Sequence, residues 1–489
     1  MKNISRYNFF FTVFIIFITF IFCLLNHKKG HNWGGDFSLY IRQASSVLNG
    51  TIENLVKSNS FTVQESSDHT FSPVTYPWGF PSLLTPVYYF SGLNYSVLKI
   101  YESIFFIGFL TVFFFSIRRK FNWIYTLCTI TLVGFNYNYI SYTNRVLSEF
   151  PFMFFSFLTL HFIKKLEVES KTNLGVQLPV AIGLLIFFSF YIRTEGIVLL
   201  FTLFIAQAAN LKGNLKVDLF NIKQCLKLII PYLIFLACYI LSKAVFPTGF
   251  TSHFGYRNLV NLDRTITNVI FYKNQLARSV YPNLPEWFFW ATIIFFLRGV
   301  VFRFRTDKAF LVFLASIVTV FLVWPFHESR YLFTIYPIFI YFVLQGLRTF
   351  RRRSALRWIV ASIIFVYLGL TINQTFQATI DSFRNRADVI DGPESGPSQE
   401  MFRFIRNRTS PSDVIIFFKP RVMNLYTQRN SLMVYNDIEN VRRKGNYLVI
   451  YSKAGKVCQL FLSPKEMSLN SNFKSIFKNN DFTVYKILN

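Results

Sequence analysis

The chain has few acidic residues and few cysteines. Of its 489 residues only 24 are Asp or Glu and five are Cys, whereas Lys and Arg together number 51. The cysteines form no CxxC pair and no metal-ligand spacing, and most of them fall in or beside apolar runs. A cysteine in that setting is usually a small buried hydrophobe, so the sequence shows neither a disulfide framework nor a zinc site. It also contains no internal repeats.

Apolar and aromatic residues are abundant instead. Hydrophobic residues make up 52% of the chain and aromatic residues 19%. A soluble domain cannot bury so much apolar surface, whereas a bundle of transmembrane helices can present it to lipid. The formal net charge of +27 would suggest nucleic acid as the partner of a soluble protein. Here the Lys and Arg residues stand in short runs between apolar segments, so membrane topology explains them and no nucleic-acid partner is expected.

Apolar segments of spanning length predict a polytopic α-helical membrane protein with about eleven transmembrane helices. They cover residues 8–26, 98–117, 122–137, 147–164, 176–192, 195–210, 226–246, 286–303, 308–325, 330–348 and 355–373. With the N-terminus on the cytoplasmic side, every basic cluster between spans falls on that same side, as the positive-inside rule requires. The first segment lacks a small-x-small cleavage site before Gly34, so we expect it to be retained as a helix.

The same topology places four regions on the outer face: residues 27–97, 136–148, 247–285 and the C-terminal region. The first of these loops contains Tyr76-Pro77-Trp78-Gly79-Phe80-Pro81 and an apolar run that ends at Phe90. Because three prolines interrupt this stretch, it fits a helix at the membrane interface better than a full span.

A small C-terminal α/β domain on the outer face is predicted to follow the membrane domain of residues 1–374. Residues 375–397 are interpreted as a linker that contains a Gly-, Pro- and Ser-rich run. In residues 398–489, Ser398 is expected to cap a short amphipathic helix, and strands are expected at 413–418, 431–435, 446–451 and 482–487. This domain shows no Gly-rich phosphate loop and no catalytic signature.

Two carboxylates stand out on the predicted outer face. Asp36 follows the first span in Trp33-Gly34-Gly35-Asp36, and Glu149 opens the fourth span in Ser148-Glu149-Phe150-Pro151. An acid at the edge of a span is costly unless it meets water or a partner, which makes both residues functional candidates. Simpler interpretations also exist, because Asp36 could cap the helix after it and Glu149 could merely suit a helix dipole. Together, two carboxylates could divide the work of removing a proton and orienting an acceptor or a cation.

Several cations are expected on the same face as these acids. Arg193 and Glu195 form a polar break between two short spans, and Arg330 and Tyr331 precede a span that contains Pro337. The loop 247–285 adds His253, Arg257, Arg264 and Lys273. Any one arginine near a bilayer surface often only reaches lipid phosphates. Collectively they supply the positive charge that a lipid-phosphate leaving group would require.

These motifs together resemble the GT-C superfamily of polyprenyl-phosphate-sugar-dependent glycosyltransferases. The likeness is greatest to the branch that holds protein O-mannosyltransferases and the aminoarabinose transferase of lipid A. The matching residues, which run in family order over roughly the first 350 positions, are Asp36, Tyr40 and Ala44; Tyr76, Pro77, Gly79 and Pro81; Glu149 and Pro151; Arg193, Glu195 and Gly196; and Arg330, Tyr331, Leu332 and Pro337. In many members a Glu follows the Asp that corresponds to Asp36. This chain has Phe37 at that position, so no residue here can fill a role that depends on the second acid.

The resemblance implies an inverting transfer of a hexosyl or pentosyl group from a polyprenyl phosphate to a glycan, glycolipid or protein hydroxyl. It implies that Asp36 is the general base, assisted by Glu149. The residues expected to hold the leaving phosphate are Arg193, Arg330 and Arg257, and those expected to position the substrates are Tyr40, Glu195, Tyr331 and Tyr76. The resemblance leaves open whether a divalent cation, Mg or Mn, is a cofactor. Asp36 and Glu149 would hold it.

Two rival functions stay open at this point. A polysaccharide polymerase or ligase would use a lipid-pyrophosphate glycan and would depend on arginines more than on one Asp. A transporter of lipid-linked sugars would also need many spans and outer-face cations, although such proteins often show inverted repeats and broken helices at mid-membrane. The resemblance to this family suggests that the protein lies in a bacterial inner membrane, with its active site facing the periplasm or exterior.

Overall fold

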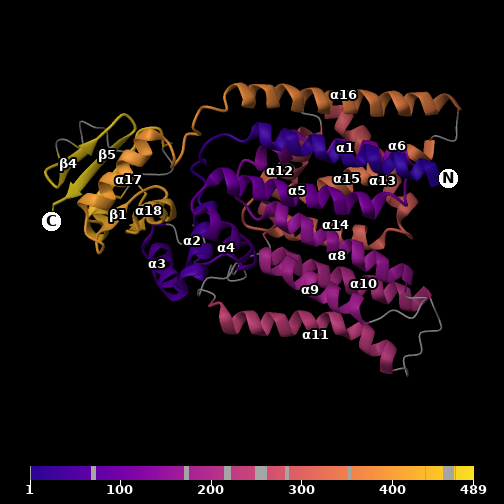
Figure 1. Ribbon diagram of the computed structural model, residues 1–489, viewed down its shortest axis with the longest axis horizontal. Coiled ribbons are helices and arrows are strands. Elements are labelled where there is room, and N and C mark those ends of the chain that lie inside the picture. Colours follow the sequence, from indigo (N-terminus) through magenta and orange to yellow (C-terminus); the bar gives the residue numbers. More distant parts are fainter. Residues whose placement is uncertain are drawn as a thin grey trace.

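The computed structural model describes residues 2–67, 73–169, 176–213, 222–247, 261–280, 286–350, 354–435, 437–454, 467 and 470–488. Figure 1 shows long helices lying side by side, with a small sheet domain in gold and yellow at the end opposite the N-terminus. Helices α2, α3 and α4 lie between the long helices and this domain. The chain therefore consists of a helical bundle, a middle layer and a terminal α/β domain.

The long helices of the bundle coincide with the apolar segments predicted from the sequence. They are α1 Lys2–Asn26, α5 Tyr95–Ile117, α6 Trp123–Gly134, α8 Glu149–Glu169, α9 Gln177–Ile192, α10 Val198–Gly213, α11 Ile222–Val245, α13 Glu286–Arg303, α14 Lys308–Val323, α15 Tyr336–Thr349 and α16 Ser354–Arg384. Within the described residues, α1, α5, α11 and α16 are long and apolar enough to cross a membrane by length and composition. The helical membrane architecture is thus present, whereas the number of about eleven spans stays a prediction.

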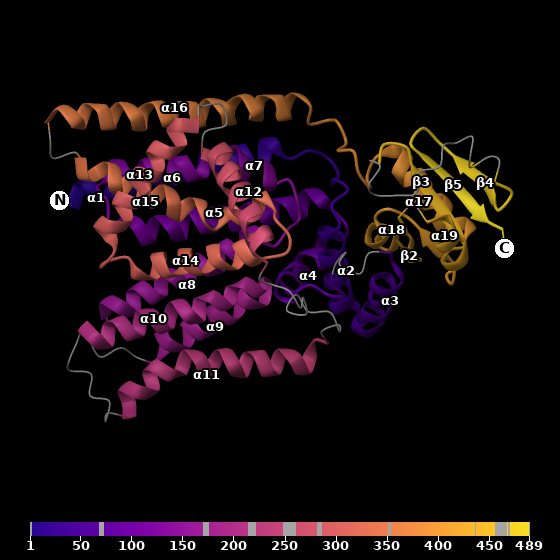
Figure 2. The ribbon, with the colours of Figure 1, turned by 180° about the vertical axis from the view of Figure 1, so that it is seen from behind.

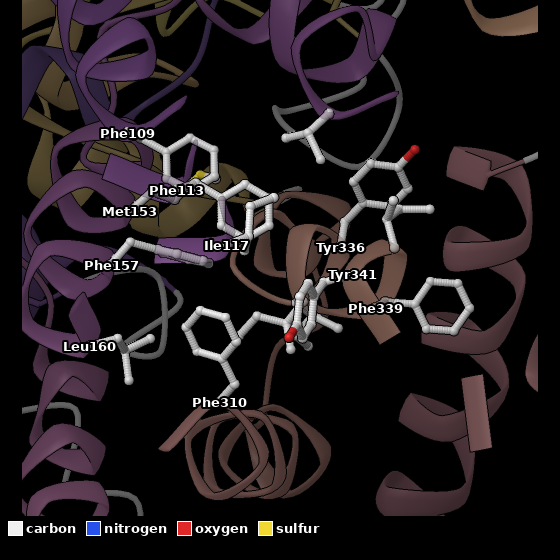
Figure 3. Packing of buried hydrophobic residues seen from close by; sticks show 14 of the residues in the cluster. Phe109, Phe113, Ile117, Met153, Phe157, Leu160, Phe310, Tyr336, Phe339 and Tyr341 are labelled. Atoms are coloured by element: carbon white, nitrogen blue, oxygen red, sulfur yellow. The ribbon is translucent and has the colours of Figure 1, made fainter. Parts of the chain in front are cut away.

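Aromatic side chains fill the centre of the bundle. Figure 3 shows Phe109 and Phe113 of α5 facing Met153 and Phe157 of α8, with Phe310 of α14 close by. The rings of Phe109 and Phe157 meet edge to face, with their centroids 4.8 Å apart. Such a pair adds roughly 0.5–1.5 kcal/mol beyond the burial of its surface. The abundance of Phe in the sequence therefore serves interior packing as well as contact with lipid.

Helices α13 and α15 approach each other at two glycines. A Cβ atom on Gly299 would lie 1.8 Å from the carbonyl oxygen of Phe342, and one on Gly346 would lie 1.9 Å from that of Phe295. Small residues allow helix backbones in membranes to touch in this way. The contact fixes α15, whose preceding residues enter the candidate site.

A buried ion cluster joins the basic loops at the end of the bundle where the N-terminus lies. Asp307, which has no exposed surface, pairs with Lys164 at 2.7 Å, Arg303 at 2.6 Å and Lys120 at 3.7 Å. Nη1 of Arg348 donates to the carbonyl of Lys120 at 2.7 Å. Basic residues at the ends of four predicted spans therefore meet in space.

Shorter helices form the opposite end of the bundle. They are α2 Asp36–Asn49, α3 Ile52–Glu65, α4 Gly79–Ser91, α7 Tyr137–Tyr142, η1 Thr194–Ile197, α12 Leu262–Val280 and η3 Ser329–Phe333. The apolar run of the first loop is the helix α4, which contains Pro86 and abuts the end of α9: a Cβ on Gly79 would lie 2.5 Å from the backbone of Tyr191. Helix α12 occupies part of the 247–285 region, where the sequence analysis placed only a loop.

The C-terminal domain contains a five-stranded sheet with the order β2-β1-β3-β5-β4. Its strands are β1 Val414–Ile416, β2 Asn430–Leu432, β3 Tyr447–Tyr451, β4 Phe473–Lys478 and β5 Phe482–Ile487, and its helices are α17 Gly396–Arg408, α18 Pro420–Thr427 and α19 Ile438–Lys444. Strand β1 is parallel to β2 and β3, and helices α18 and α19 make the crossovers between β1 and β2 and between β2 and β3. Strand β5 is antiparallel to β3 and β4. The domain is therefore of mixed α/β type.

Three local details differ from the sequence predictions. Strand β4 was not predicted, because Phe473–Lys478 alternates poorly between apolar and polar residues. Helix α17 begins before Ser398, whose hydroxyl donates to the carbonyl of Gly392 at 2.8 Å and so does not cap the helix. Helix α16 continues to Arg384, ten residues into the stretch interpreted as a linker, because its polar end still packs on α1 and α7.

Candidate active site

Asp36 is the first residue of α2, and its carboxylate is held from two sides. Oδ2 accepts a hydrogen bond from Nη2 of Arg330 at 2.8 Å, and Oδ1 accepts one from the hydroxyl of Tyr76 at 2.6 Å. Gly35 takes the N-cap position, and the Asp36 side chain makes its contacts outside the helix instead of capping it. Burial raises the pKa of Asp36, but Arg330 and Tyr76 outweigh burial and bring this pKa down to about 2. Asp36 is therefore ionised at neutral pH.

Glu149 is the first residue of α8 and lies beside the same guanidinium. Its Oε1 pairs with Nη1 of Arg330 at 3.3 Å and with Nη1 of Arg193 at 2.6 Å. Its Oε2 is buried and has no hydrogen-bond partner among the described residues. The position also suits a helix dipole, as the simpler interpretation proposed. An acid that is 6% exposed and touches two guanidiniums nevertheless does more than stabilise a helix end.

Arg193 ends α9 in an extended conformation and turns its side chain toward both glutamates. Its Nε donates to Oε1 of Glu195 at 2.6 Å, in addition to the contact with Glu149. The charged groups thus form a continuous chain in the order Glu195, Arg193, Glu149, Arg330 and Asp36. Three carboxylates face two guanidiniums, so both cations are already paired in the absence of a ligand.

Tyrosines complete the surroundings of the charge chain. The ring of Tyr40 lies 4.7 Å from that of Tyr76 between centroids, and its hydroxyl forms a 3.0 Å hydrogen bond with Ser148. Burial, together with the neighbouring Tyr76 and Asp36, raises the pKa of Tyr40 well above its usual value, so its hydroxyl stays protonated. The ring of Tyr331 stands under the Arg193 guanidinium at 5.5 Å. The structure therefore brings the four predicted positioning residues Tyr40, Tyr76, Glu195 and Tyr331 to one place.

The C-terminal domain contributes an arginine that the sequence analysis missed. Arg421 of α18 is 2% exposed; its Nη1 lies 3.5 Å from the hydroxyl of Tyr76, and its Nη2 donates to the carbonyl of Pro73. Its guanidinium also stands 5.4 Å from the centroid of the Tyr76 ring. Arg421 is thus two contacts away from Asp36, and its charge contributes to the lowered pKa of that carboxyl.

Trp33 anchors the segment before Asp36 to the same domain. Its ring lies 5.2 Å from Phe418, 5.5 Å from Tyr451 and 6.1 Å from Phe482, measured between centroids. Since Trp33 precedes Asp36 by three residues, docking of the sheet domain constrains where α2 begins. No local pattern in the sequence around Trp33 indicates these partners.

Two charged residues of α5 that were not predicted as part of the site hold the loops before Asp36 and Glu149. Nζ of Lys99 donates to the carbonyl of Lys28 at 2.8 Å, and Oε1 of Glu102 accepts from the backbone N–H of Leu147 at 3.3 Å. Nε2 of His31 accepts from the N–H of Val146 at 3.1 Å, and burial lowers the pKa of His31 to about 3, so its ring is neutral. Two charges in an apolar span were the signal in the sequence.

The other cations named from the sequence lie apart from this site or outside the described residues. Arg257 and His253 fall outside the described residues. Lys273 pairs with Glu286 at 2.8 Å, which occupies it away from the charge chain.

The donor set suits a guanidinium better than a divalent ion. Arg330 lies between Asp36 and Glu149 and pairs with both, which is the place that a bridging cation would take. Within the described part of the chain, no group of three or more His, Cys, Asp or Glu side chains could hold a metal ion.

Known structures share this fold. The chain aligns with the crystal structure of ArnT from Cupriavidus metallidurans bound to undecaprenyl phosphate over 97% of both chains, with a TM-score of 0.56 and 10% identity. It also aligns with the oligosaccharyltransferase AglB from Archaeoglobus fulgidus in complex with an inhibitory peptide and a dolichol-phosphate, over 90% of this chain and 69% of that one, with a TM-score of 0.52 and 11% identity. No protein-family model matches the chain, and no curated protein sequence matches it either.

Both structural neighbours belong to the GT-C superfamily, so the fold that the sequence motifs predicted is confirmed. With ArnT, the lipid A aminoarabinose transferase, the alignment includes the C-terminal part of the chain, since it covers nearly the whole of both proteins. Identities near one residue in ten establish the fold and leave the reaction to be argued from the site.

Proposed function

We propose that this protein is an inverting glycosyltransferase that moves a sugar from a polyprenyl-phosphate donor to an acceptor hydroxyl. The observation that carries the proposal is the position of Arg330, which bridges Asp36 and Glu149 at 2.8 and 3.3 Å. A candidate base, a second acid and a cation for the leaving phosphate thereby lie within one set of contacts. The fold shared with proteins that bind undecaprenyl phosphate and dolichol-phosphate supports a lipid-linked donor.

In the proposed step, the acceptor hydroxyl loses its proton to the carboxylate of Asp36. The acceptor oxygen forms a bond to the anomeric carbon of the donor sugar from the face opposite the phosphate. The bond between that carbon and the phosphate oxygen breaks, and polyprenyl phosphate leaves with the electron pair. Phosphate leaves well once its charge is stabilised, so the enzyme needs a base on one side and cations on the other.

Arg330 would exchange partners as the donor binds. A carboxylate whose pKa is about 2 is a weak base, since efficient bases have a pKa nearer to the working pH. If the donor phosphate draws Arg330 away, Asp36 loses its main stabilising charge and its pKa rises toward the useful range. Nε of Arg330 is buried and has no partner among the described residues, so one donor is free for a phosphate oxygen. Donor binding and activation of the base are then the same event.

The remaining residues support this exchange. Arg193 would hold the phosphate from the other side of Glu149, and Arg257 stays the third proposed phosphate ligand. Glu195 holds Arg193 in place, and Tyr76 would keep Asp36 oriented after Arg330 leaves. The C-terminal domain would shape the acceptor side of the site through Arg421. A multi-pass location in a bacterial inner membrane, with this site facing the periplasm, belongs to the same proposal.

The decisive experiment measures release of free polyprenyl phosphate from a panel of polyprenyl-phosphate sugars by the purified protein. We expect release by the wild type, a loss of at least 10³-fold in Asp36→Asn with donor binding retained, and no change in Asp388→Asn. Asp388 is an exposed acid outside the site and serves as the matched control. Release that survives Asp36→Asn would refute the assigned base. Turnover of lipid-pyrophosphate glycans alone would indicate the polymerase or ligase reaction, and transport without release would indicate a transporter.

A further inference from the structure

One turn of helix α5 lies behind the two segments that carry the acids of the proposed site. Figure 2 shows α5 running through the bundle to the end where α2 and α4 lie. Lys99 and Glu102 stand three residues apart in this turn, so they share a face of the helix. Neither residue has any exposed surface. Charged groups buried in a membrane helix are costly, and where they occur they usually serve a specific partner.

Lys99 holds the segment that leads into Asp36. Its Nζ donates to the backbone carbonyl of Lys28 at 2.8 Å and also to that of Gly30. Among the described residues no carboxylate pairs with Lys99, so these two carbonyls take the place of a counter-ion. The backbone between α1 and α2 is thereby fixed just before Asp36.

Glu102 holds the segment that leads into Glu149. Its Oε1 accepts a hydrogen bond from the backbone N–H of Leu147 at 3.3 Å. Ser148, which stands between Leu147 and Glu149, accepts one from Nη1 of Arg193 at 3.4 Å. The start of α8 and its contact with Arg193 therefore depend on a loop that α5 anchors.

His31 links these two segments to each other. Its Nε2 accepts from the N–H of Val146 at 3.1 Å, so Nδ1 carries the proton and donates to the carbonyl of Asn32 at 2.9 Å. Its ring stacks on that of Phe37, the residue after Asp36, with the centroids 3.9 Å apart. A shift of the loop at Val146 would therefore reach the start of α2.

The separation of the two acids matters because both contact Arg330. Its Nη2 lies 2.8 Å from Oδ2 of Asp36, and its Nη1 lies 3.3 Å from Oε1 of Glu149. A guanidinium is planar and rigid, so it bridges two carboxylates only when their separation is fixed. A displacement of about 1 Å at a catalytic group can reduce a rate by about a hundredfold. The anchoring by α5 therefore bears directly on the proposed reaction.

We infer that Lys99 and Glu102 are positioning residues that set the separation of Asp36 and Glu149. Lys99 acts through the segment before α2, and Glu102 acts through the loop before α8. The inference rests on the proposed function, because it concerns the same reaction and the same two acids. Neither Lys99 nor Glu102 touches the donor or the acceptor, so their loss should lower kcat and leave the KM for the donor nearly unchanged.

The first test measures turnover of polyprenyl-phosphate sugars by the full chain in lipid nanodiscs. Glu102→Leu removes the acceptor for the Leu147 N–H, whereas Glu102→Gln keeps an oxygen that can accept it. We expect kcat to fall about 30–100-fold in Glu102→Leu and in Lys99→Met, with the KM for the donor within about threefold of the wild type. Glu102→Gln should keep kcat within about threefold of the wild type. Thr111→Val on the same helix is the matched control, because its hydroxyl bonds to the carbonyl of Ile107 within α5.

Hydrogen exchange followed by mass spectrometry gives a second measurement that does not depend on turnover. In Glu102→Leu the peptide that contains Leu147 should exchange about tenfold faster than in the wild type, because the loop before α8 has lost its anchor. The same peptide should exchange at the wild-type rate in Glu102→Gln and in Thr111→Val.

Four results would overturn the inference: a wild-type kcat in Glu102→Leu and Lys99→Met, an equal loss of kcat in Glu102→Gln and Glu102→Leu, a KM that rises as much as kcat falls, or unchanged exchange at Leu147. Failure of the proposed function is distinguishable, since the wild type would then release no polyprenyl phosphate while exchange at Leu147 still responds to Glu102→Leu. Wild-type turnover that these variants leave intact would preserve the catalytic proposal and remove the positioning role of α5 from it.

Discussion

Replacing Arg330 with Gln tests how this site controls the charge of Asp36. In the wild type the pKa of Asp36 lies at about 2, compared with 3.8 for an unperturbed carboxyl, and Arg330 is the main lowering influence. Gln removes that charge but leaves the burial, which acts in the opposite direction. We therefore expect the pKa of Asp36 to rise above 3.8 in Arg330→Gln.

The lowered pKa also makes a contribution to stability. The fall of the Asp36 pKa from 3.8 to about 2 corresponds to about 2 kcal/mol of stability, because a change of one pKa unit is worth about 1.4 kcal/mol. The Asp36 side chain is 27% exposed, so water screens part of this interaction. Because the folded pKa is the lower one, the contribution is fully present above about pH 4 and is lost as the pH falls toward 2. Arg330→Gln should therefore lower the thermal midpoint at neutral pH but much less near pH 2.

Two measurements check this reasoning. In the pH profile of kcat/KM for donor turnover, an acid limb that inflects above pH 4 should appear in Arg330→Gln and be absent from the wild type. Thermal midpoints at pH 7 and at low pH should show the stability difference shrinking. Arg386→Gln is the control, since Arg386 is exposed and lies over the ring of Phe383, away from the site. A profile of Arg330→Gln that lacks this acid limb, together with equal thermal midpoints at all pH values, would refute the control of Asp36 by Arg330.

Three further perturbations follow from the contacts. Asp307→Asn leaves Lys164 and Arg303 buried without an anion. We expect the free energy of unfolding, measured by denaturant titration, to fall by about 3–5 kcal/mol. A variant with the same unfolding free energy as the wild type would contradict the ion cluster. Trp33→Ala removes the ring packed on Phe418 and Tyr451. We expect the free energy that docks the C-terminal domain to fall by about 3–5 kcal/mol, so that proteolysis releases this domain faster. Equal proteolysis rates would count against this docking. Arg421→Gln should reduce donor turnover by about tenfold or more while α18 remains folded, because a buried cation near Tyr76 is lost. Full activity of this variant would show that the C-terminal domain does not contribute to the site.

Much of the fold could be predicted because its signals are local in the sequence. Apolar runs of spanning length marked the helices, and the basic loops marked one end of the bundle, where Lys164 and Arg303 now meet at Asp307. Strands β1, β2, β3 and β5 followed from short apolar runs, whereas β4 did not. Helix α12 was not predicted, because it is amphipathic and contains no continuous apolar run.

The sequence predicted which residues of the candidate site share the outer face. It did not predict which of them contact one another. Asp36, Glu149, Arg193 and Arg330 were all named, because polar residues at the ends of apolar helices are conspicuous. Arg421 and Trp33 were not assigned to the site, since an arginine and a tryptophan in polar segments have many ordinary uses. Lys99 and Glu102 lay inside a predicted span and drew no role.

The sequence by itself determined where the long apolar helices lie along the chain and which acids and arginines stand at their ends. Hydrophobic runs and charge clusters act over tens of residues, so they can be recognised without knowing the packing. Only the tertiary structure decided that Arg330 pairs with Asp36 across 294 positions and that Arg421 reaches Tyr76 across 345. Those pairs depend on how the helices pack and on where the C-terminal domain docks, and no local pattern encodes either.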